Sequence, residues 1–174
     1  MGLVDLFDVL RDVLLVTAVV VYLAMTAGRL DRLHIGVDAA RASLELQLAL
    51  RAEAIAEVLA EGFVDPVSQQ LLSTALGRRR GQEALVADAE SELSALLREL
   101  VDAHDGVVAE PEVQEQLRSA CNRAEYAYRF YNDAVDQTVR MRVRPIVKYL
   151  GLAGHTALPE RLDCDLQAPE FAAA

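Results

Sequence analysis

The chain of 174 residues has 27 acidic and 17 basic side chains, a formal net charge of −10 and no Trp, and its length leaves room for one domain and a further segment. Ala, Leu, Glu and Arg, which have high helix propensity, are abundant, so the composition predicts an all-α fold. The acidic charge argues against a surface that binds the phosphate backbone. We therefore expect no nucleic acid among the partners.

The first predicted element is the uncharged apolar run VLLVTAVVVYLAMTA, residues 13–27. A bilayer span needs about 20 residues, with about 17 as the lower limit, so the run is short by itself. Gly28 and the apolar side chains within residues 3–10 extend it, while the charged groups before residue 13 can reach the interface. Since a charged helical pattern follows at Arg29 without an intervening proline, we predict that residues 1–28 are an uncleaved, single-pass membrane anchor in the lipid bilayer.

Two alternatives to an anchor are a cleaved signal peptide and a helix buried in a soluble core. A signal peptide needs a basic start and a cleavage site between small residues, whereas residues 1–12 carry three aspartates against Arg11. Basic residues next to a span also set its orientation, and Arg29, Arg32 and Arg41 follow this run. This bias predicts that the bulk of the chain lies in the cytoplasm.

Residues 29–148 have the pattern of an antiparallel three-helix bundle, with helices predicted at 29–62, 66–104 and 111–148. The first helix continues directly from the anchor. Apolar residues recur three and four positions apart along the first and third helices, as on the buried face of a packed helix. On the third helix this seam comprises Leu117, Cys121, Ala124, Tyr128, Tyr131, Val135 and Thr138. The connections are short, which makes neighbouring helices antiparallel.

The connection between the first two predicted helices is GFVDP, residues 62–66. Gly62 suits the position just past a helix end, and Asp65 followed by Pro66 suits a helix start. The sequence therefore predicts a sharp break at this connection.

A basic cluster of Arg78, Arg79 and Arg80 lies between Gly77 and Gly81 in the second predicted helix. Each glycine lowers helix stability by about 1 kcal/mol relative to Ala, so we expect a kink or a short loop. The three arginines are a candidate basic contact patch for phosphate or lipid headgroups. Polybasic lipid sites carry about four to eight basic residues, however, which favours a solvated turn that balances the acidic stretch after it.

The sequence has no pattern of catalytic or metal-binding residues. His104 lies between Asp102 and Asp105, but the repeated Glu-x-x-His signature of di-iron bundles is absent. Cys121 and Cys164 are far apart and neither has a CxxC partner. We therefore expect no enzymatic activity, no bound metal and no cofactor.

The periodicity fades after Pro145, and glycines and prolines punctuate the remaining chain. We expect residues 149–174 to form an extended tail that packs locally, and its end, residues 167–174, to be disordered.

Three segments carry a family resemblance. Residues 38–59 form a long helical pattern after the anchor, residues 89–97 are AESELSALL, and residues 128–135 are YRFYNDAV. Together they resemble the long first helix, the AE-x-x-L-x-x-x-L stretch and the aR-x-YN-x-av signature of the LemA family of membrane-anchored bacterial helical proteins. The chain departs from the family pattern at residues 54–57, so it resembles a divergent member.

The resemblance implies an N-terminal anchor, a long antiparallel helical bundle and no established enzymatic activity. It also makes Tyr128, Arg129, Tyr131 and Asn132 the family-motif residues of this chain. The predicted function is a non-enzymatic, membrane-anchored scaffold or interaction protein that binds another membrane or envelope protein, or a second copy of itself. The alternative is a transmembrane signalling or sensor bundle, which needs a ligand pocket or an output domain that the sequence does not indicate.

Overall fold

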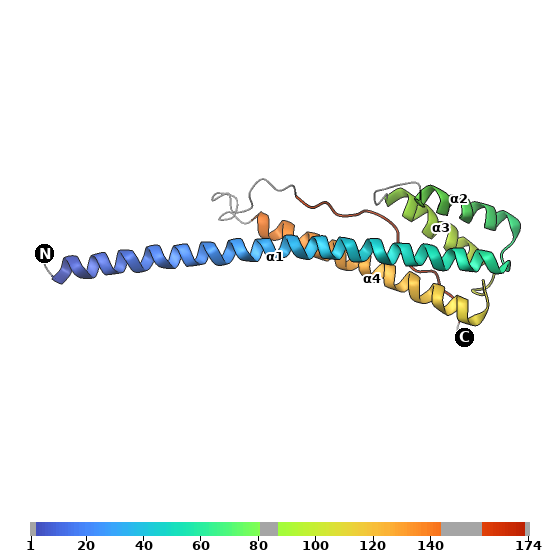
Figure 1. Ribbon diagram of the computed structural model, residues 1–174, viewed down its shortest axis with the longest axis horizontal. Helices are drawn as coiled ribbons and strands as arrows, with labels where there is room; N and C mark the ends of the chain where they lie inside the picture. The colour runs from blue at the N-terminus through green and yellow to red at the C-terminus, as the bar shows by residue number, and fades with distance from the viewer. Residues whose placement is uncertain (1–2, 81–86, 144–157, 173–174) are drawn as a thin grey trace. The chain divides into compact units, whose positions relative to one another are not determined.

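The computed structural model describes residues 3–80, 87–143 and 158–172 (Figure 1). Within these ranges the chain forms four helices, α1 (Leu3–Glu61), α2 (Pro66–Arg80), α3 (Ala87–Ala103) and α4 (Pro111–Arg142), and no β-strand. The predicted all-α fold class is confirmed for this part of the chain. The predicted end of the third helix, residues 144–148, lies outside the described residues.

The chain divides into two compact units. One comprises residues 1–38 and 134–159, and the other comprises residues 39–133 and 160–174. Both α1 and α4 contribute to each unit, and the two units are described separately below.

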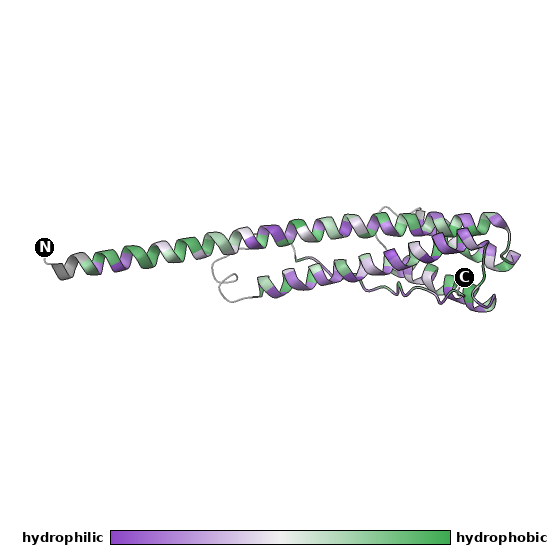
Figure 2. Ribbon diagram, turned by 90° about the horizontal axis from the view of Figure 1, so that it is seen from below, coloured by the Kyte–Doolittle hydropathy of each residue, from purple (hydrophilic) through white to green (hydrophobic). Residues whose placement is uncertain are grey.

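The predicted anchor and the first predicted helix form one unbroken helix, α1, of 59 residues. Its N-terminal part contains an 18-residue window with a mean hydropathy of 2.0, of which 6% is buried. Figure 2 shows predominantly apolar residues along this part of α1. Length and composition thus allow the helix to cross a membrane. The described residues leave the window almost wholly exposed, so it is not part of a core among them.

In the unit that contains the N-terminal part of α1, a small core joins α1 to the end of α4. Leu30 and Met141 are buried, and Leu33 packs against them. Val135 and Thr138, one and two turns earlier on α4, are also fully buried. Apart from the half-buried Tyr128, every residue of the predicted seam on α4 is buried, so the predicted buried face of this helix is confirmed.

The larger core belongs to the unit of residues 39–133 and 160–174. It collects apolar side chains from all four helices, and its fully buried members include Ile55, Val58, Leu72, Leu93, Leu97 and Leu117. On α3 the buried residues Leu93, Leu97 and Leu100 recur four and three positions apart, which gives this helix one apolar face. Burial of these faces is the main force that holds the unit together.

The GFVDP connection is confirmed as a sharp break. Gly62 has a φ of 76°, a left-handed conformation that glycine adopts without steric cost and that suits the end of α1. The Asp65 carboxylate accepts hydrogen bonds from the backbone N–H of Val67 at 3.0 Å and of Ser68 at 3.1 Å. Asp65 therefore caps the start of α2.

The second predicted helix is two helices. α2 continues past Gly77 to Arg80, α3 begins at Ala87, and the two pack side by side (Figure 1). Leu72, Ala75 and Leu76 of α2 are buried in the same core as Leu93 of α3. A single straight helix could not bring these two apolar stretches together, and the expected interruption of the segment 66–104 is present after Arg80.

The tail is extended over residues 158–172 and packs against the unit of residues 39–133. Cys164 and Leu166 are buried, and Ala168 and Phe171 pack on the core. The predicted disorder of residues 167–174 does not hold for residues 167–172, because Ala172 donates a 3.0 Å backbone hydrogen bond to the Gly106 carbonyl. Apolar contacts of this end of the tail compensate the entropy of ordering it.

Candidate functional site

The first candidate surface is the exposed apolar segment of α1. Its large side chains are more than half exposed: Val13, Leu14, Leu15, Val16, Val19, Val20, Val21, Tyr22 and Met25. Successive helical residues point about 100° apart, so this run presents apolar side chains on every side of the helix. Soluble monomers rarely expose continuous apolar patches of this kind, whereas lipid chains match them.

The two threonine hydroxyl groups inside this segment are satisfied within the helix. Thr17 donates to the carbonyl of Val13, and Thr26 donates to the carbonyl of Tyr22, both at 2.8 Å. Such bonds keep the threonine hydroxyls from facing an apolar environment without an acceptor. At the N-terminal flank, Arg11 pairs with Asp8 and Asp12, both at 3.1 Å.

A second notable region is the docking of the tail on α4, and it uses two of the family-motif residues. Asn132 Nδ2 donates to the carbonyl of Leu162 at 3.0 Å, and the Leu162 N–H donates to Asn132 Oδ1 at 3.0 Å. The Tyr131 hydroxyl donates to the Glu160 carbonyl at 2.9 Å. Adjacent side chains on α4 thereby bind the backbone of an extended segment that has no strand partner.

The other two motif residues have no hydrogen bond to residues 158–172 of the tail. Arg129 is exposed and forms an ion pair with Glu125, one turn earlier on α4. Tyr128 is half-buried on the seam. The structure thus brings Tyr131 and Asn132 together at one contact and places Arg129 on the surface.

Further contacts follow along the tail in the opposite direction to α4. The Ala168 N–H donates to Glu125 Oε2 at 3.1 Å. Arg118 donates to the Ala172 carbonyl and lies over the Phe171 ring, with 5.7 Å from its guanidinium carbon to the ring centroid. Because tail residue numbers rise as α4 numbers fall, the tail runs back along this helix.

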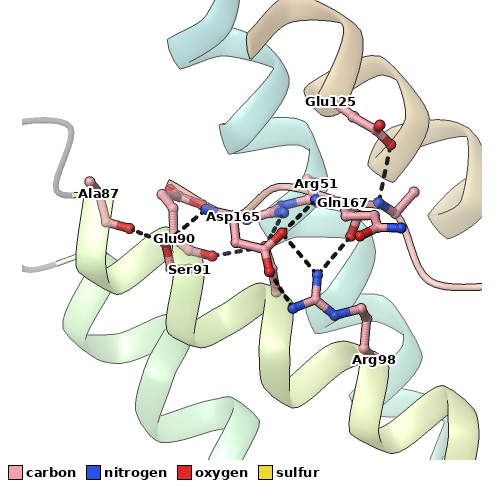
Figure 3. A network of polar contacts seen from close by, with 10 residues as sticks. Arg51, Ala87, Glu90, Ser91, Arg98, Glu125, Asp165 and Gln167 are labelled. Atoms are coloured by element: carbon pink, nitrogen blue, oxygen red, sulfur yellow. Dashed lines mark hydrogen bonds and ion pairs between the residues drawn. The ribbon is translucent and has the colours of Figure 1, made fainter. Parts of the chain in front are cut away.

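A buried ionic cluster lies beneath the tail (Figure 3). Arg51 of α1 donates to Glu90 of α3 at 2.5 Å and to the Ser94 hydroxyl at 2.8 Å. Arg79 of α2 donates to the other oxygen of Glu90 at 2.7 Å. The side chains of Arg51 and Glu90 are 3% and 4% exposed, so this pair is removed from solvent. The Glu90 carboxylate therefore links α3 to both α1 and α2.

A half-exposed ion pair holds the tail to α3. Arg98 donates through Nη1 and Nη2 to the two Asp165 oxygens at 3.0 and 2.5 Å, and the Asp165 N–H donates to the Ser91 hydroxyl at 3.0 Å (Figure 3). The hydrogen bond from Arg98 lowers the pKa of Asp165 below its usual value. Two contacts to a single tail residue fix its register on α3.

The candidate basic patch is divided by these contacts. Arg78 pairs with Glu92 at 2.9 Å on the surface, and Arg79 points to the buried Glu90. The Arg80 side chain lies outside the described part of the structure. Two of the three arginines therefore bind acidic side chains of α3, and they lie in the last turn of the helix α2 and not in a solvated turn.

Neither cysteine is activated for nucleophilic chemistry. Burial raises the pKa of Cys121 to about 11 and that of Cys164 to about 12, so both thiols are protonated at neutral pH. The Nδ1–H of His104 donates to the Leu100 carbonyl at 2.9 Å. Among the described residues, no group of three or more His, Cys, Asp or Glu side chains is arranged to hold a metal ion.

Sequence reasoning missed the buried cluster, although a signal for it exists. Arg51 lies three residues after Leu48 and four before Ile55, on the apolar stripe of its helix. Glu90 lies three residues before Leu93 on the stripe of α3. Opposite charges at core positions of two different helices are a pattern that predicts a buried ion pair.

In comparisons with protein-family models, curated proteins and solved structures, no match to this chain was found.

Proposed function

We propose that this protein is a membrane-anchored, non-enzymatic scaffold that binds another membrane or envelope protein through its helical domain. The observation that carries the proposal is the exposed, uncharged surface of α1 from residue 13 to residue 27, which matches a lipid environment and no aqueous one. In this proposal α1 crosses the bilayer once. The positive charges of Arg29, Arg32 and Arg41 support a cytoplasmic location for the residues that follow.

The helical domain has the features of a binding scaffold and lacks those of a catalyst in its described residues. Its buried charges bind one another, and its thiols are held protonated. We propose an antiparallel bundle in which α2 and α3 together take the place of the second helix. The resemblance of YRFYNDAV to the LemA signature supports this architecture and a bacterial envelope setting, with a second copy as the alternative partner.

The test of the anchor is extraction of cell membranes with alkaline carbonate. Leu15→Arg combined with Val19→Arg introduces two charges into the apolar segment, and we expect the variant to move to the supernatant. Ser43→Arg with Leu46→Arg, on α1 outside that segment, is the charge-matched control and stays in the membrane pellet. Release of the unaltered chain by carbonate contradicts the proposal.

The orientation needs a reporter on an exposed position, because both natural cysteines are buried. Gln70→Cys on α2 supplies one. A membrane-impermeant maleimide should label this cysteine only after the cells are opened. Labelling of intact cells overturns the cytoplasmic placement and leaves the anchor itself unaffected.

The second candidate, a signalling bundle, is favoured by one observation, the absence of any break in α1 between the apolar segment and the core residues Ala52 to Leu59. A signal relay requires that changes in the span reach residues 39–133. To test for such a relay, two glycines are inserted after Gly36, and hydrogen exchange is measured in residues 39–133. Unchanged exchange in residues 39–133 supports the scaffold, and altered exchange supports the relay.

A further inference from the structure

An open groove with a volume of about 780 Å³ lies between α1 and α4 in the unit of residues 39–133. Ala54 of α1 and Ala120 of α4 form its floor and are buried. Their short side chains leave the space that larger residues at these positions would fill. The groove is separate from the tail, which contacts α4 through Asn132, Glu125 and Arg118.

The rim of the groove is acidic. Glu53 and Glu57 stand on the α1 side, one turn apart, and Glu112 and Glu115 stand on the α4 side. Within the described part of the chain, the carboxylates of Glu53, Glu57 and Glu112 have no hydrogen bond or ion pair. Glu115 has only a weak contact of 3.6 Å to Arg118, with 63% of its side chain exposed. The floor of the groove is therefore apolar, and ion pairs within the chain compensate little of the negative charge of the four carboxylates on its rim.

The apolar surface continues beyond one end of the groove. Leu50 lines the groove, and Leu46 lies one turn earlier on α1 with 57% of its surface exposed. Arg123 lines the groove on α4, and Tyr126 and Phe130 follow on the same side of the helix, 68% and 64% exposed. Exposed Leu, Tyr and Phe side chains beside a groove are typical of protein-binding surfaces.

We propose that this groove binds a basic amphipathic helix of a partner protein. The apolar face of that helix covers Ala54, Ala120 and the exposed Leu46, Tyr126 and Phe130, and its Lys or Arg residues meet the glutamates. This proposal rests on the proposed function, because it states the chemical class of the partner that the scaffold binds. The aromatic side chains that the partner helix buries supply most of the affinity. The glutamates supply charge selectivity and a fast association rate.

Other occupants fit the groove less well. A symmetric contact between two copies would place the same four glutamates of each copy against one another, in a chain of net charge −10. The tail is already bound on other residues of α4, and its last described residue, Ala172, is fixed to Gly106. The charge of the rim therefore favours a cationic partner over a second copy or the chain's own end.

The test uses the full chain in lipid nanodiscs and a fluorescent helical peptide of Leu and Lys with all lysines on one face. A peptide of the same composition in scrambled order, which has no apolar face, is the probe control. Fluorescence anisotropy gives the dissociation constants, and hydrogen exchange locates the contact. We expect the amphipathic peptide to bind at least tenfold more tightly than the scrambled one and to protect residues 46–57 and 112–130.

Two variants separate the charge from the apolar contact. Glu53→Gln, Glu57→Gln and Glu112→Gln combined should weaken binding at least tenfold at low salt and flatten its salt dependence. Leu46→Ala with Tyr126→Ala should weaken binding to a similar extent and leave the salt dependence unchanged. Glu99→Gln, Asp102→Asn and Asp133→Asn, exposed acids outside the groove, form the charge-matched control and should change binding less than twofold.

Equal weakening by the control triple overturns the proposal, because it indicates attraction by net charge alone. Protection outside the groove, or a dimer in sedimentation equilibrium that the glutamine triple strengthens, also overturns it. The substituted side chains are surface groups, so the variants should fold as the unaltered chain does. Circular dichroism verifies this for each variant. Carbonate extraction of the same variants reports on the anchor independently, which distinguishes failure of the groove from failure of the proposed function.

Discussion

The side chain of Asn132 forms two hydrogen bonds with the backbone of Leu162, each 3.0 Å long. The amide oxygen accepts and the amide nitrogen donates, as a neighbouring β-strand would do for one residue. Asn132 is 6% exposed, so these bonds lie in a protected environment. One residue of α4 thereby sets the register of the tail that follows it.

Asn132→Ala should destabilise the protein by about 1–3 kcal/mol, because it leaves the half-buried N–H and carbonyl of Leu162 without their partner. Urea unfolding of the full chain in detergent measures this change, and hydrogen exchange should increase first in residues 160–166. Asn122→Ala, on the exposed side of the same helix, is the control and should stay within about 0.5 kcal/mol. Equal effects of the two variants would show that the tail contact is unimportant.

Glu90→Ala should be far more damaging than loss of an exposed ion pair. It leaves Arg51, with a side chain 3% exposed, as an uncompensated buried charge, which costs about 3–5 kcal/mol. Replacing both Arg51 and Glu90 by Met should recover much of that loss, since the charge is then removed as well. Thermal unfolding compares these variants with Glu92→Ala, whose exposed pair with Arg78 contributes about 0–1 kcal/mol.

Stability should fall at alkaline pH through the buried thiol of Cys164. Its pKa in the folded state is raised to about 12 from an ordinary value of 9.0, so the unfolded chain loses this proton first. The stabilisation is complete below pH 9 and is lost between pH 9 and 12, with a slope of at most about 1.4 kcal/mol per pH unit. Cys164→Ala should flatten the decline between pH 9 and 11, and an unchanged slope would argue against a buried thiol.

Gly106→Ala should loosen the end of the tail. Gly106 has a φ of 80°, a conformation that costs other residues about 1–2 kcal/mol, and an added Cβ would collide with the backbone nitrogen of Ala172. Gly77→Ala is the matched control, because a Cβ on this helical glycine meets no atom within 4 Å. We expect the control to stabilise α2 by about 0.5–1 kcal/mol. Limited proteolysis of the C-terminus and thermal unfolding distinguish the two variants.

The sequence predicted the parts of this fold that depend on periodicity and local capping. The seam of α4, the continuity of α1 and the break at Gly62 and Asp65 follow from helical spacing and from the conformations that Gly and Asp prefer. Each of these features involves residues close together in the chain. They were therefore visible without knowledge of the tertiary contacts.

The hairpin of α2 and α3 and the docked tail depend on contacts between distant residues. The kink or loop expected between Gly77 and Gly81 begins at the end of this span, because α2 continues through Gly77 and ends at Arg80. The tail has no periodic pattern, because its backbone bonds to side chains such as Asn132 and Glu125 in place of a strand. The charges of Arg51 and Glu90 on apolar stripes are a signal of a tertiary contact that the sequence analysis did not use.

The opposite directions of the tail and α4 have a mechanical consequence. A force applied at the C-terminus, as by a processive unfoldase, loads the contacts of Ala172, Ala168 and Leu162 one after another and never all at once. Peeling of this kind requires much less force than shearing the same bonds together. Residues 160–172 are therefore the part of this unit that such a force should release first.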